Sequence, residues 1–328
     1  RRARRRARHA QRHGNEMPRH EAMLKLRPPP ASCASNSTFV SLLSNESWVP
    51  GALCLLKALL AVRSRCPLLL VVDDVTSRGS QRAIPESALA TLRSSFGSAS
   101  MMPLSRMTER ISQHEARTSA ALGRRLKQEA HPSGWVQNTH GKLLLFALPG
   151  FRRAAFLDLD MVIVDNMDAL LDEPPFSAVA AMPYSTRLFN SGVFVFEPSL
   201  AAASSLAALS RATDTGVGGK PAAVRIRGAM EQRGTSHLSD QSVLNHFFKG
   251  RWRPLPYGYN AGKKIYMAKR ELWKQMQVGA IHFVGRPKPW DVPYNPTSPP
   301  AAQLRSRLDA TALYNKWHEK CPQVAQTG

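Results

Sequence analysis

Short apolar runs of strand length alternate with longer segments of helical periodicity along most of the chain. Thr38 to Leu43 and Leu68 to Val72 are such runs, and between them Gly51 to Arg63 carries apolar residues at helical spacing. A continuous apolar run bounded by breakers is typical of a buried parallel strand. This part of the chain therefore predicts a strand–helix–strand unit of the βαβ type.

The same alternation continues downstream. Short apolar runs predict further strands at 154–157, 177–182 and 192–196, and longer patterns predict helices at 107–130 and 142–148. Alternating strands and helices predict an α/β fold with a mostly parallel central sheet. Residues 214–236 are rich in Gly, Lys and Arg and have no clear period, so we predict a mobile loop there.

Composition and charge add two constraints. With 43% hydrophobic and 21% charged residues in a chain of 328, wholesale disorder is excluded. The longest apolar run, Gly51 to Val62, is interrupted by Lys57 and is too short to cross a bilayer. The formal net charge is +22, and residues 1–27 hold nine Arg and one Lys against two Glu. We expect residues 1–30 to form a basic, disordered tail that binds polyanions without recognising a specific nucleic acid.

The four cysteines give a weaker signal. Cys33, Cys54, Cys66 and Cys321 include no CxxC pair, so neither a zinc site nor a redox dithiol is indicated. Nothing in their spacing predicts a disulfide framework, and Cys54 fits a small core residue inside the apolar helical pattern. This usage favours a reducing compartment, so cytoplasmic localisation is the expectation, with the Golgi or a plastid as alternatives.

Two carboxylates follow one of the predicted strands directly. Asp158 and Asp160 come at the end of the apolar run 154–157, and ligands bind at the carboxyl ends of strands in open α/β sheets. Carboxylates at this spacing can converge on one cation, and hard oxygen ligands suit Mg²⁺ or Mn²⁺. Acidic residues in such places also serve simply as turn and cap formers.

A second candidate lies far downstream. His282 ends a short apolar strand, a glycine turn follows, and Lys288 then stands between two prolines. An imidazole added to two carboxylates favours Mn²⁺ over Mg²⁺, and a lysine on a stiff loop can meet a diphosphate. The alternative is a half-buried histidine with a satisfied hydrogen bond and an ordinary surface lysine.

Several segments of the chain, taken together and in this order, resemble glycosyltransferase family 8, in particular its glycogenin and galactinol synthase members. The matching segments are TFVSLLSNESWVPGAL, THGKLLLF, FLDLDMVIVDNMDALL, FNSGVFVFEPSL, DQSVLNHFF, LPYGYN and HFVGRPKPW. The resemblance implies a single nucleotide-sugar-binding domain of the GT-A type over residues 36–320. It also implies a UDP-sugar donor, a Mn²⁺ cofactor and transfer of the sugar with retention of its anomeric configuration.

The resemblance also implies roles for individual residues, carried over by position in the matching segments. The implied metal ligands are Asp158, Asp160 and His282. The implied donor-binding residues are Leu42, Ser44, Asn45 and Trp48 for the nucleoside, the Leu159 backbone for the ribose, Asn190 and Ser191 for the sugar, and Gly285 and Lys288 for the diphosphate. The implied catalytic residues are Lys142, which contacts the donor, and Asp240 and Gln241, which lie beneath the reacting carbon.

The leading hypothesis is therefore a glycogenin-like, Mn²⁺-dependent hexosyltransferase acting on a hydroxyl acceptor such as a glycan, a polyol or a protein tyrosine. Galactinol-synthase-like or glucuronosyltransferase-type transfer is the alternative, and a polyanion-binding or scaffold protein is a distant one. A homodimer is compatible with the sequence.

Three positions depart from the family pattern. Leu159 stands where the family has a small residue, so its bulk is expected to crowd the donor, and His237 replaces an acidic residue of glycogenin. Tyr266 is one position out of register with the tyrosine that glycogenin glucosylates. We therefore expect the acceptor to be a separate molecule.

Overall fold

The structure, a computed structural model, describes residues 20–74, 84–97, 100–121, 141–214, 239–295 and 310–322. Within these residues a seven-stranded sheet has the strand order β3-β2-β1-β4-β7-β6-β8. Only β7 runs antiparallel to its neighbours among the strand pairs of this sheet. The predicted α/β fold with a mostly parallel sheet is thus confirmed. The strands are β1 (Ser37–Leu43), β2 (Leu68–Val72), β3 (Met101–Pro103), β4 (Arg153–Leu157), β6 (Ser177–Ala180), β7 (Phe189–Phe196) and β8 (Arg253–Leu255).

A second, three-stranded sheet lies beside the carboxyl end of β4. Its order is β5-β10-β9, formed by β5 (Met161–Ile163), β9 (Ala261–Gly262) and β10 (Ala280–His282). Strand β10 pairs antiparallel with β5 and parallel with β9. Of this small sheet only β10 was predicted, as the short apolar strand that ends at His282, because β5 and β9 have three and two residues and carry no periodic signal.

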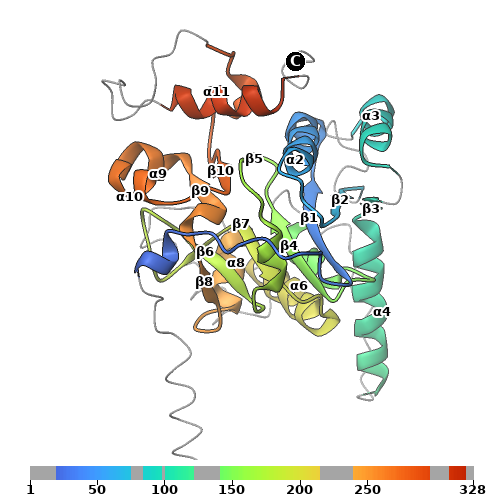
Figure 1. Cartoon of the computed structure of the whole chain (residues 1–328). Helices are drawn as coiled ribbons and strands as arrows, with labels where there is room; N and C mark the ends of the chain where they lie inside the picture. The colour runs from blue at the N-terminus through green and yellow to red at the C-terminus, as the bar shows by residue number, and fades with distance from the viewer. Residues whose placement is uncertain are drawn as a thin grey trace, which may run out of the picture.

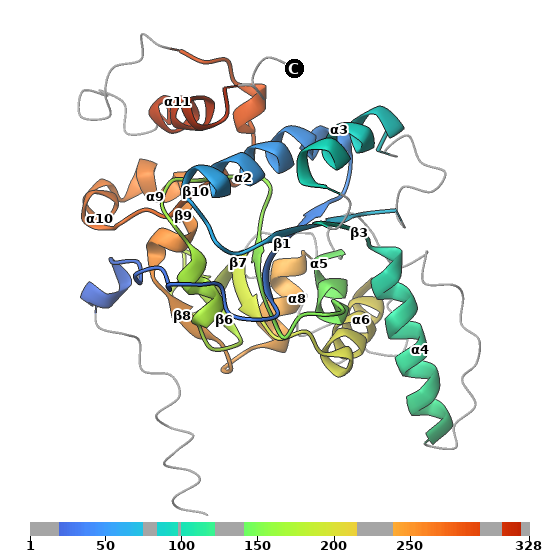
Figure 2. The same cartoon turned by 45° about the vertical axis from the view of Figure 1, so that its right-hand side comes forward.

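Helices cover both faces of the large sheet (Figures 1 and 2). Figure 2 shows one group above the sheet, α2 (Val49–Ala61) and α3 (Glu86–Phe96). The group below comprises α4 (Ser105–Ala121), α5 (Gly141–Leu144), α6 (Leu200–Asp214) and α8 (Asp240–Phe247). Near the small sheet lie α9 (Lys263–Ala268), α10 (Arg270–Gln275) and α11 (Thr311–Lys320). None of these described helices has the length and apolarity needed to cross a membrane.

Short 3₁₀ turns complete the described elements: η2 (His20–Met23), η3 (Glu46–Trp48), η6 (Leu145–Ala147), η7 (Asp168–Asp172), η8 (Tyr257–Asn260) and η9 (Pro289–Asp291). The core between β4, β7 and the lower helices is rich in aromatic rings. Phe194 is fully buried, and its ring lies 5.1 Å from that of Phe156 and 5.4 Å from that of Phe176. This packing fixes β7 against β4, and both strands lead into the candidate site.

Two of the predicted segments are the mobile loop 214–236 and the basic tail 1–30. The predicted mobile loop 214–236 lies outside the described residues except for residue 214, which ends α6, and residues 1–19 of the predicted tail also lie outside them. Residues 20–30, expected to be disordered, instead pack on the domain, with Met23 1% and Leu26 9% exposed. Met23 and Leu26 are buried while most other residues of the segment are exposed, so the segment contacts the domain through a few apolar side chains.

The cysteine prediction was also wrong, because all four cysteines are paired. One disulfide joins Cys33 to Cys66, and another joins Cys54 to Cys321 across 267 residues of sequence. The folded chain brings α11 back onto α2, a proximity that sequence spacing does not reveal. Disulfides persist in oxidising compartments, so the cysteines no longer support the cytoplasmic expectation.

Candidate active site

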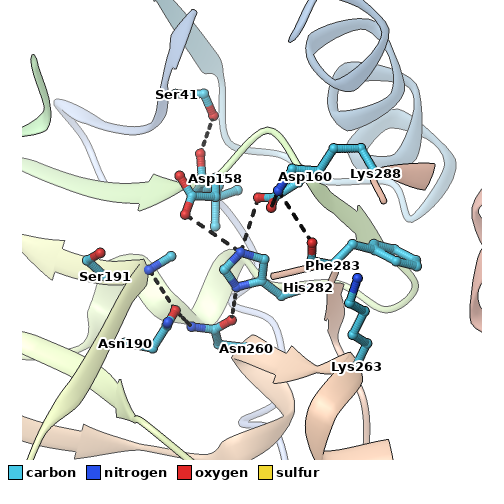
Figure 3. A network of polar contacts seen from close by, with 12 residues as sticks. Ser41, Asp158, Asp160, Asn190, Ser191, Asn260, Lys263, His282, Phe283 and Lys288 are labelled. Carbon is cyan, nitrogen blue, oxygen red and sulfur yellow. Dashed lines mark hydrogen bonds and ion pairs between the residues drawn. The ribbon is translucent and has the colours of Figure 1, made fainter. Parts of the chain in front are cut away.

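The site is built where the large sheet meets the small one. Asp158 follows β4, and Asp160 immediately precedes β5. His282 ends β10 and pairs in register with Met161, which places its ring beside Asp160. One ligand atom from each of Asp158, Asp160 and His282 lies within 4.8 Å of the others. The structure therefore brings together the three predicted metal ligands (Figure 3).

Two lysines lie against these carboxylates. Lys142 of α5 has its Nζ 2.8 Å from Asp158 Oδ1 and 3.2 Å from Asp240 Oδ2. Lys288 has its Nζ 2.5 Å from Asp160 Oδ2. Lys142 precedes Asp158 by 16 residues and Lys288 follows Asp160 by 128, and the fold places both lysines on the predicted metal-binding pair.

These ion pairs set the protonation states of the site. Burial favours the neutral form of Lys142, but Asp158 and Asp240 outweigh burial and raise its pKa above the usual range. Burial would also raise the pKa of Asp160, but His282 and then Lys288 hold that pKa well below its ordinary value. Burial, together with the neighbouring charge of Asp160, raises the pKa of Asp158 despite the Lys142 ammonium. Lys142 is thus charged and Asp160 is ionised at neutral pH.

A chain of side-chain amides extends from the histidine. His282 Nδ1 lies 2.7 Å from Asn260 Oδ1, and Asn260 Nδ2 donates to Asn190 Oδ1 at 2.8 Å. Asn190 Nδ2 in turn donates to Gln241 Oε1 at 3.0 Å. The predicted metal ligand is therefore connected to a predicted catalytic residue through two asparagines (Figure 3 shows the first part of this chain).

The first turn of α8 carries Asp240 and Gln241. Ser239 caps the helix through its side chain, so the start of α8 is fixed next to β7. Ser191 of β7 contacts both residues: its hydroxyl donates to Asp240 Oδ2 at 2.8 Å and its N–H to Gln241 Oε1 at 3.2 Å. The predicted sugar-site and reacting-carbon residues thus form one cluster next to the metal ligands.

The predicted nucleotide-binding residues are divided between the site and the packing around it. Trp48 lies beside the predicted diphosphate loop, the segment that contains Gly285 and Lys288. Its ring lies 4.8 Å from Lys288 Nζ and 5.7 Å from the ring of Trp290. Gly285 has a φ of 81°, a backbone conformation that favours glycine, and so permits the turn before Lys288.

The other predicted nucleoside residues lie on β1 and in the loop that follows it. Leu42 is half-buried on β1, and Ser44 follows the strand directly. Asn45 uses its side-chain oxygen to cap η3 by accepting from the Ser47 N–H. Leu159 is 3% exposed and belongs to the hydrophobic core, and the expectation that its bulk crowds the donor stays a prediction.

Two residues of the site were not predicted. Asn260 lies in the quoted segment LPYGYN, so its position was available from the sequence although its contact with His282 was not. Lys263 is a buried lysine near the diphosphate loop, and its Nζ donates to the Pro287 carbonyl at 3.3 Å. No motif indicated Lys263, because α9 alone gives no reason to bury a lysine.

The sequence profile described as "Glycosyl transferase family 8" matches residues 39–292, more than half of the chain. The chain belongs to glycosyltransferase family 8. The matched range begins in β1 and ends just after η9, so it contains every residue of the cluster described above.

Curated relatives include glycogenins and a plant enzyme. The chain is 34% identical to human Glycogenin-2 over 165 residues, covering 48% of this chain and 28% of that protein. It is 31% identical to Glycogenin-1 of Mus musculus over 165 residues, covering 47% of this chain and 42% of that protein. It is 24% identical over 259 residues to UDP-glucuronate:xylan alpha-glucuronosyltransferase 2 of Arabidopsis thaliana, covering 75% of this chain and 34% of that protein. The family 8 chain thus spans less than half the length of these relatives.

Solved structures agree on the fold. The galactosyltransferase LgtC, in complex with donor and acceptor sugar analogs, matches with a TM-score of 0.51 and 16% identity, covering 87% of this chain and 95% of that one. The glycosyltransferase GlyE of Streptococcus pneumoniae matches with a TM-score of 0.50 and 13% identity, covering 88% of this chain and 63% of that one. The fold of this family 8 chain is therefore of the GT-A type.

Proposed function

We propose that this chain transfers a hexosyl group from a UDP-sugar to a hydroxyl acceptor, with retention at the anomeric carbon and with Mn²⁺ as cofactor. The observation that carries the proposal is the convergence of Asp158, Asp160 and His282 with Lys142 and Lys288 in one buried cluster. Membership of family 8 and the glycogenin relatives support it.

The donor set fits a divalent metal. Two carboxylates and one imidazole, all within 4.8 Å, offer the mixed oxygen and nitrogen ligands that suit Mn²⁺ better than Mg²⁺. Bound by these residues, the metal would neutralise the diphosphate and act as a Lewis acid on the leaving group. The protein fixes the ligands by placing two of them at the junction of β4 and β5 and the third on the neighbouring strand β10.

The two lysines supply the remaining positive charge. Cleaving the bond between the sugar and the diphosphate leaves negative charge on the departing phosphate, and preorganised cations stabilise it as it develops. Lys288 and Lys142 are each held beside a metal-binding carboxylate, so both lie next to the position where that charge appears. Ion pairs within the protein hold both ammonium groups at the site.

The reacting sugar carbon develops positive charge and needs a negative or partly negative group beside it. An oxocarbenium-like centre is stabilised by a nearby carboxylate or amide oxygen, and Asp240 and Gln241 are the candidates. Gln241 Oε1 already accepts from Asn190 and Ser191. Asp240 is contacted by described residues at Oδ2, from Ser191 and Lys142, which leaves Oδ1 for the sugar. We therefore assign stabilisation of the sugar cation to Asp240 and orientation of the cluster to Gln241.

The acceptor is a separate molecule in this proposal. Tyr266 is 3% exposed, its hydroxyl has no hydrogen-bond partner among the described residues, and its ring packs against Trp273. A phenol enclosed in this way cannot attack a donor sugar without local unfolding. The burial of Tyr266 thus agrees with its register, which is one position away from that of the glycogenin tyrosine.

The test is a product assay with purified protein, Mn²⁺ and separate UDP-glucose, UDP-galactose and UDP-glucuronate, with glycan and polyol acceptors. UDP-glucuronate is included because the plant glucuronosyltransferase aligns over 75% of this chain. UDP release and product mass are measured. We expect Asp160→Asn to lower turnover at least roughly 100-fold by removing one charge from the metal site. Asp172→Asn, an exposed acidic residue at the end of η7, should have no effect. Absence of UDP release with every donor, or an unchanged Asp160→Asn variant, would overturn the proposal.

A further inference from the structure

Lys263 is a buried cation that the proposed mechanism does not use. It is 6% exposed, and no carboxylate of the described residues forms an ion pair with it. Burial lowers its pKa, and the neighbouring charge of Lys288 lowers it further. An ammonium group taken out of water without a counter-ion is costly unless its hydrogen bonds are satisfied. The groups that hydrogen-bond to the Lys263 ammonium therefore indicate its role in the structure.

Three oxygens surround the Lys263 ammonium. Its Nζ donates to the hydroxyl of Tyr314 at 3.1 Å, to the Pro287 carbonyl at 3.3 Å and to the Arg286 carbonyl at 3.4 Å. The Tyr314 hydroxyl donates in turn to the same Pro287 carbonyl at 3.3 Å. Two successive peptide carbonyls of the diphosphate loop are thus held by two side chains, one from α9 and one from α11.

The residue after these two carbonyls is Lys288. Its own N–H donates to Asp291 Oδ2 at 3.0 Å, and its Nζ reaches Asp160 on the site side. With the carbonyls of residues 286 and 287 tied to Lys263, the loop backbone has little freedom, and Lys288 is directed into the site. Figure 3 shows Lys263 and Lys288 reaching toward Phe283 from different sides.

Helix α11 contacts the segment around Lys288 at further points. The ring of Tyr314 lies 5.4 Å from that of Phe283, and the ring of Trp317 lies 6.1 Å from that of Trp290. His318 Nε2 lies 2.6 Å from the Val292 carbonyl. Residues of α11 thus contact Phe283, Pro287, Trp290 and Val292 along this segment.

We propose that Lys263 and Tyr314 are positioning residues that fix the diphosphate loop so that Lys288 meets the diphosphate of the donor. This inference rests on the proposed function, because it requires a diphosphate ligand in the site. It predicts a specific defect: binding of the phosphates should suffer, while recognition of the nucleoside should not.

The experiment compares the affinities for UDP and for uridine, each in the presence of Mn²⁺, by NMR titration. Lys263→Met should weaken UDP binding roughly 10- to 100-fold, the range expected for losing hydrogen bonds to a charged group, and leave uridine binding within about 2-fold. Tyr314→Phe removes only the hydroxyl and should weaken UDP binding roughly 3- to 10-fold. The control is Lys264→Met, the neighbouring exposed lysine of α9, with both affinities unchanged.

Thermal unfolding of each variant accompanies the titrations, and Tyr314→Phe carries the test if Lys263→Met does not fold. Equal losses of UDP and uridine affinity would show a merely structural role and overturn the inference, as would unchanged UDP binding in both variants. If the wild-type protein itself binds no UDP, the proposed function fails and the inference with it. Wild-type UDP binding combined with an unchanged ratio in the variants overturns the inference alone.

Discussion

At the scale of single residues, a side-chain contact of His282 decides which ring nitrogen of this proposed metal ligand faces the carboxylates. Its Nδ1 faces Asn260 Oδ1, and its Nε2 faces Asp160 Oδ1 at 3.1 Å. Asn260 uses its Nδ2 to donate to Asn190, so its oxygen must be the atom that meets the ring. An oxygen there accepts from Nδ1–H, so Nε2 is the ring nitrogen that faces the carboxylates and would offer its lone pair to a metal bound between them. Asn260 therefore selects the tautomer that can bind a metal.

This argument predicts the effect of Asn260→Ala. With the acceptor removed, the ring loses its fixed tautomer and orientation, and Mn²⁺ affinity measured by calorimetry should fall roughly 10- to 100-fold. Asn245→Ala is the control, because Asn245 hydrogen-bonds to the Phe189 carbonyl and the Gln241 carbonyl nearby without touching His282. Equal losses of Mn²⁺ affinity in the two variants would show that Asn260 has no special role.

The sequence was a good guide to residues whose chemistry is tied to a motif. Asp158 and Asp160 were predicted from their place after a strand and His282 from its place at the end of another, and the resemblance to family 8 joined them as one ligand set; the structure brings all three together. Asn260 and Lys263 escaped notice, because their roles depend on which neighbour each side-chain atom faces. That information arises only when β9, β10 and α11 come together, and no local pattern encodes it.

At the scale of elements, five of the seven strands of the large sheet were predicted, whereas β3, β8 and the packing of Met23 and Leu26 were not. Leu68 to Val72 matches β2 residue for residue, because a fully buried strand is continuously apolar. Residues 20–30 contain only a few apolar positions among basic residues and prolines. Leu26 of this segment is buried because it packs on a surface that includes Gly258 and Gly279. A Cβ atom at Gly279 would lie 2.9 Å from Leu26 Cδ1, so a larger residue there would exclude Leu26.

This segment braces elements that carry the site. The Leu26 N–H donates to Gln277 Oε1, and Gly279, over which Leu26 packs, immediately precedes β10 with its terminal His282. We expect Leu26→Ala to lower the free energy of unfolding by roughly 2–5 kcal/mol in urea titrations, the usual cost of removing a buried leucine side chain. The exposed neighbour Lys25 is the control, and Lys25→Ala should change stability by less than about 0.5 kcal/mol. Indistinguishable variants would mean that the segment does not pack in solution.

At the scale of the whole molecule, the disulfides join parts of the chain that lie far apart in sequence. Cys54 lies on α2 and Cys321 follows α11, so this bond ties the last described helix to the first long one. Because α11 carries Tyr314, the same bond holds the helix that lines the diphosphate loop. Cys33–Cys66 closes only 33 residues and does not involve α11. The two bonds therefore offer a matched comparison.

We expect the double variants Cys54→Ala/Cys321→Ala and Cys33→Ala/Cys66→Ala each to lose about 2–5 kcal/mol of unfolding free energy, as is typical for removing a native disulfide. Alanine is chosen because a serine hydroxyl at the fully buried Cys54 and Cys321 would add an unsatisfied polar group. Only the first variant should also weaken UDP binding relative to uridine binding, because only that bond restrains α11. The measurements are urea unfolding and the two titrations at a temperature where both variants are folded. If both variants leave the ratio of UDP to uridine affinity unchanged, α11 keeps its place without the bond, and the disulfide serves stability alone.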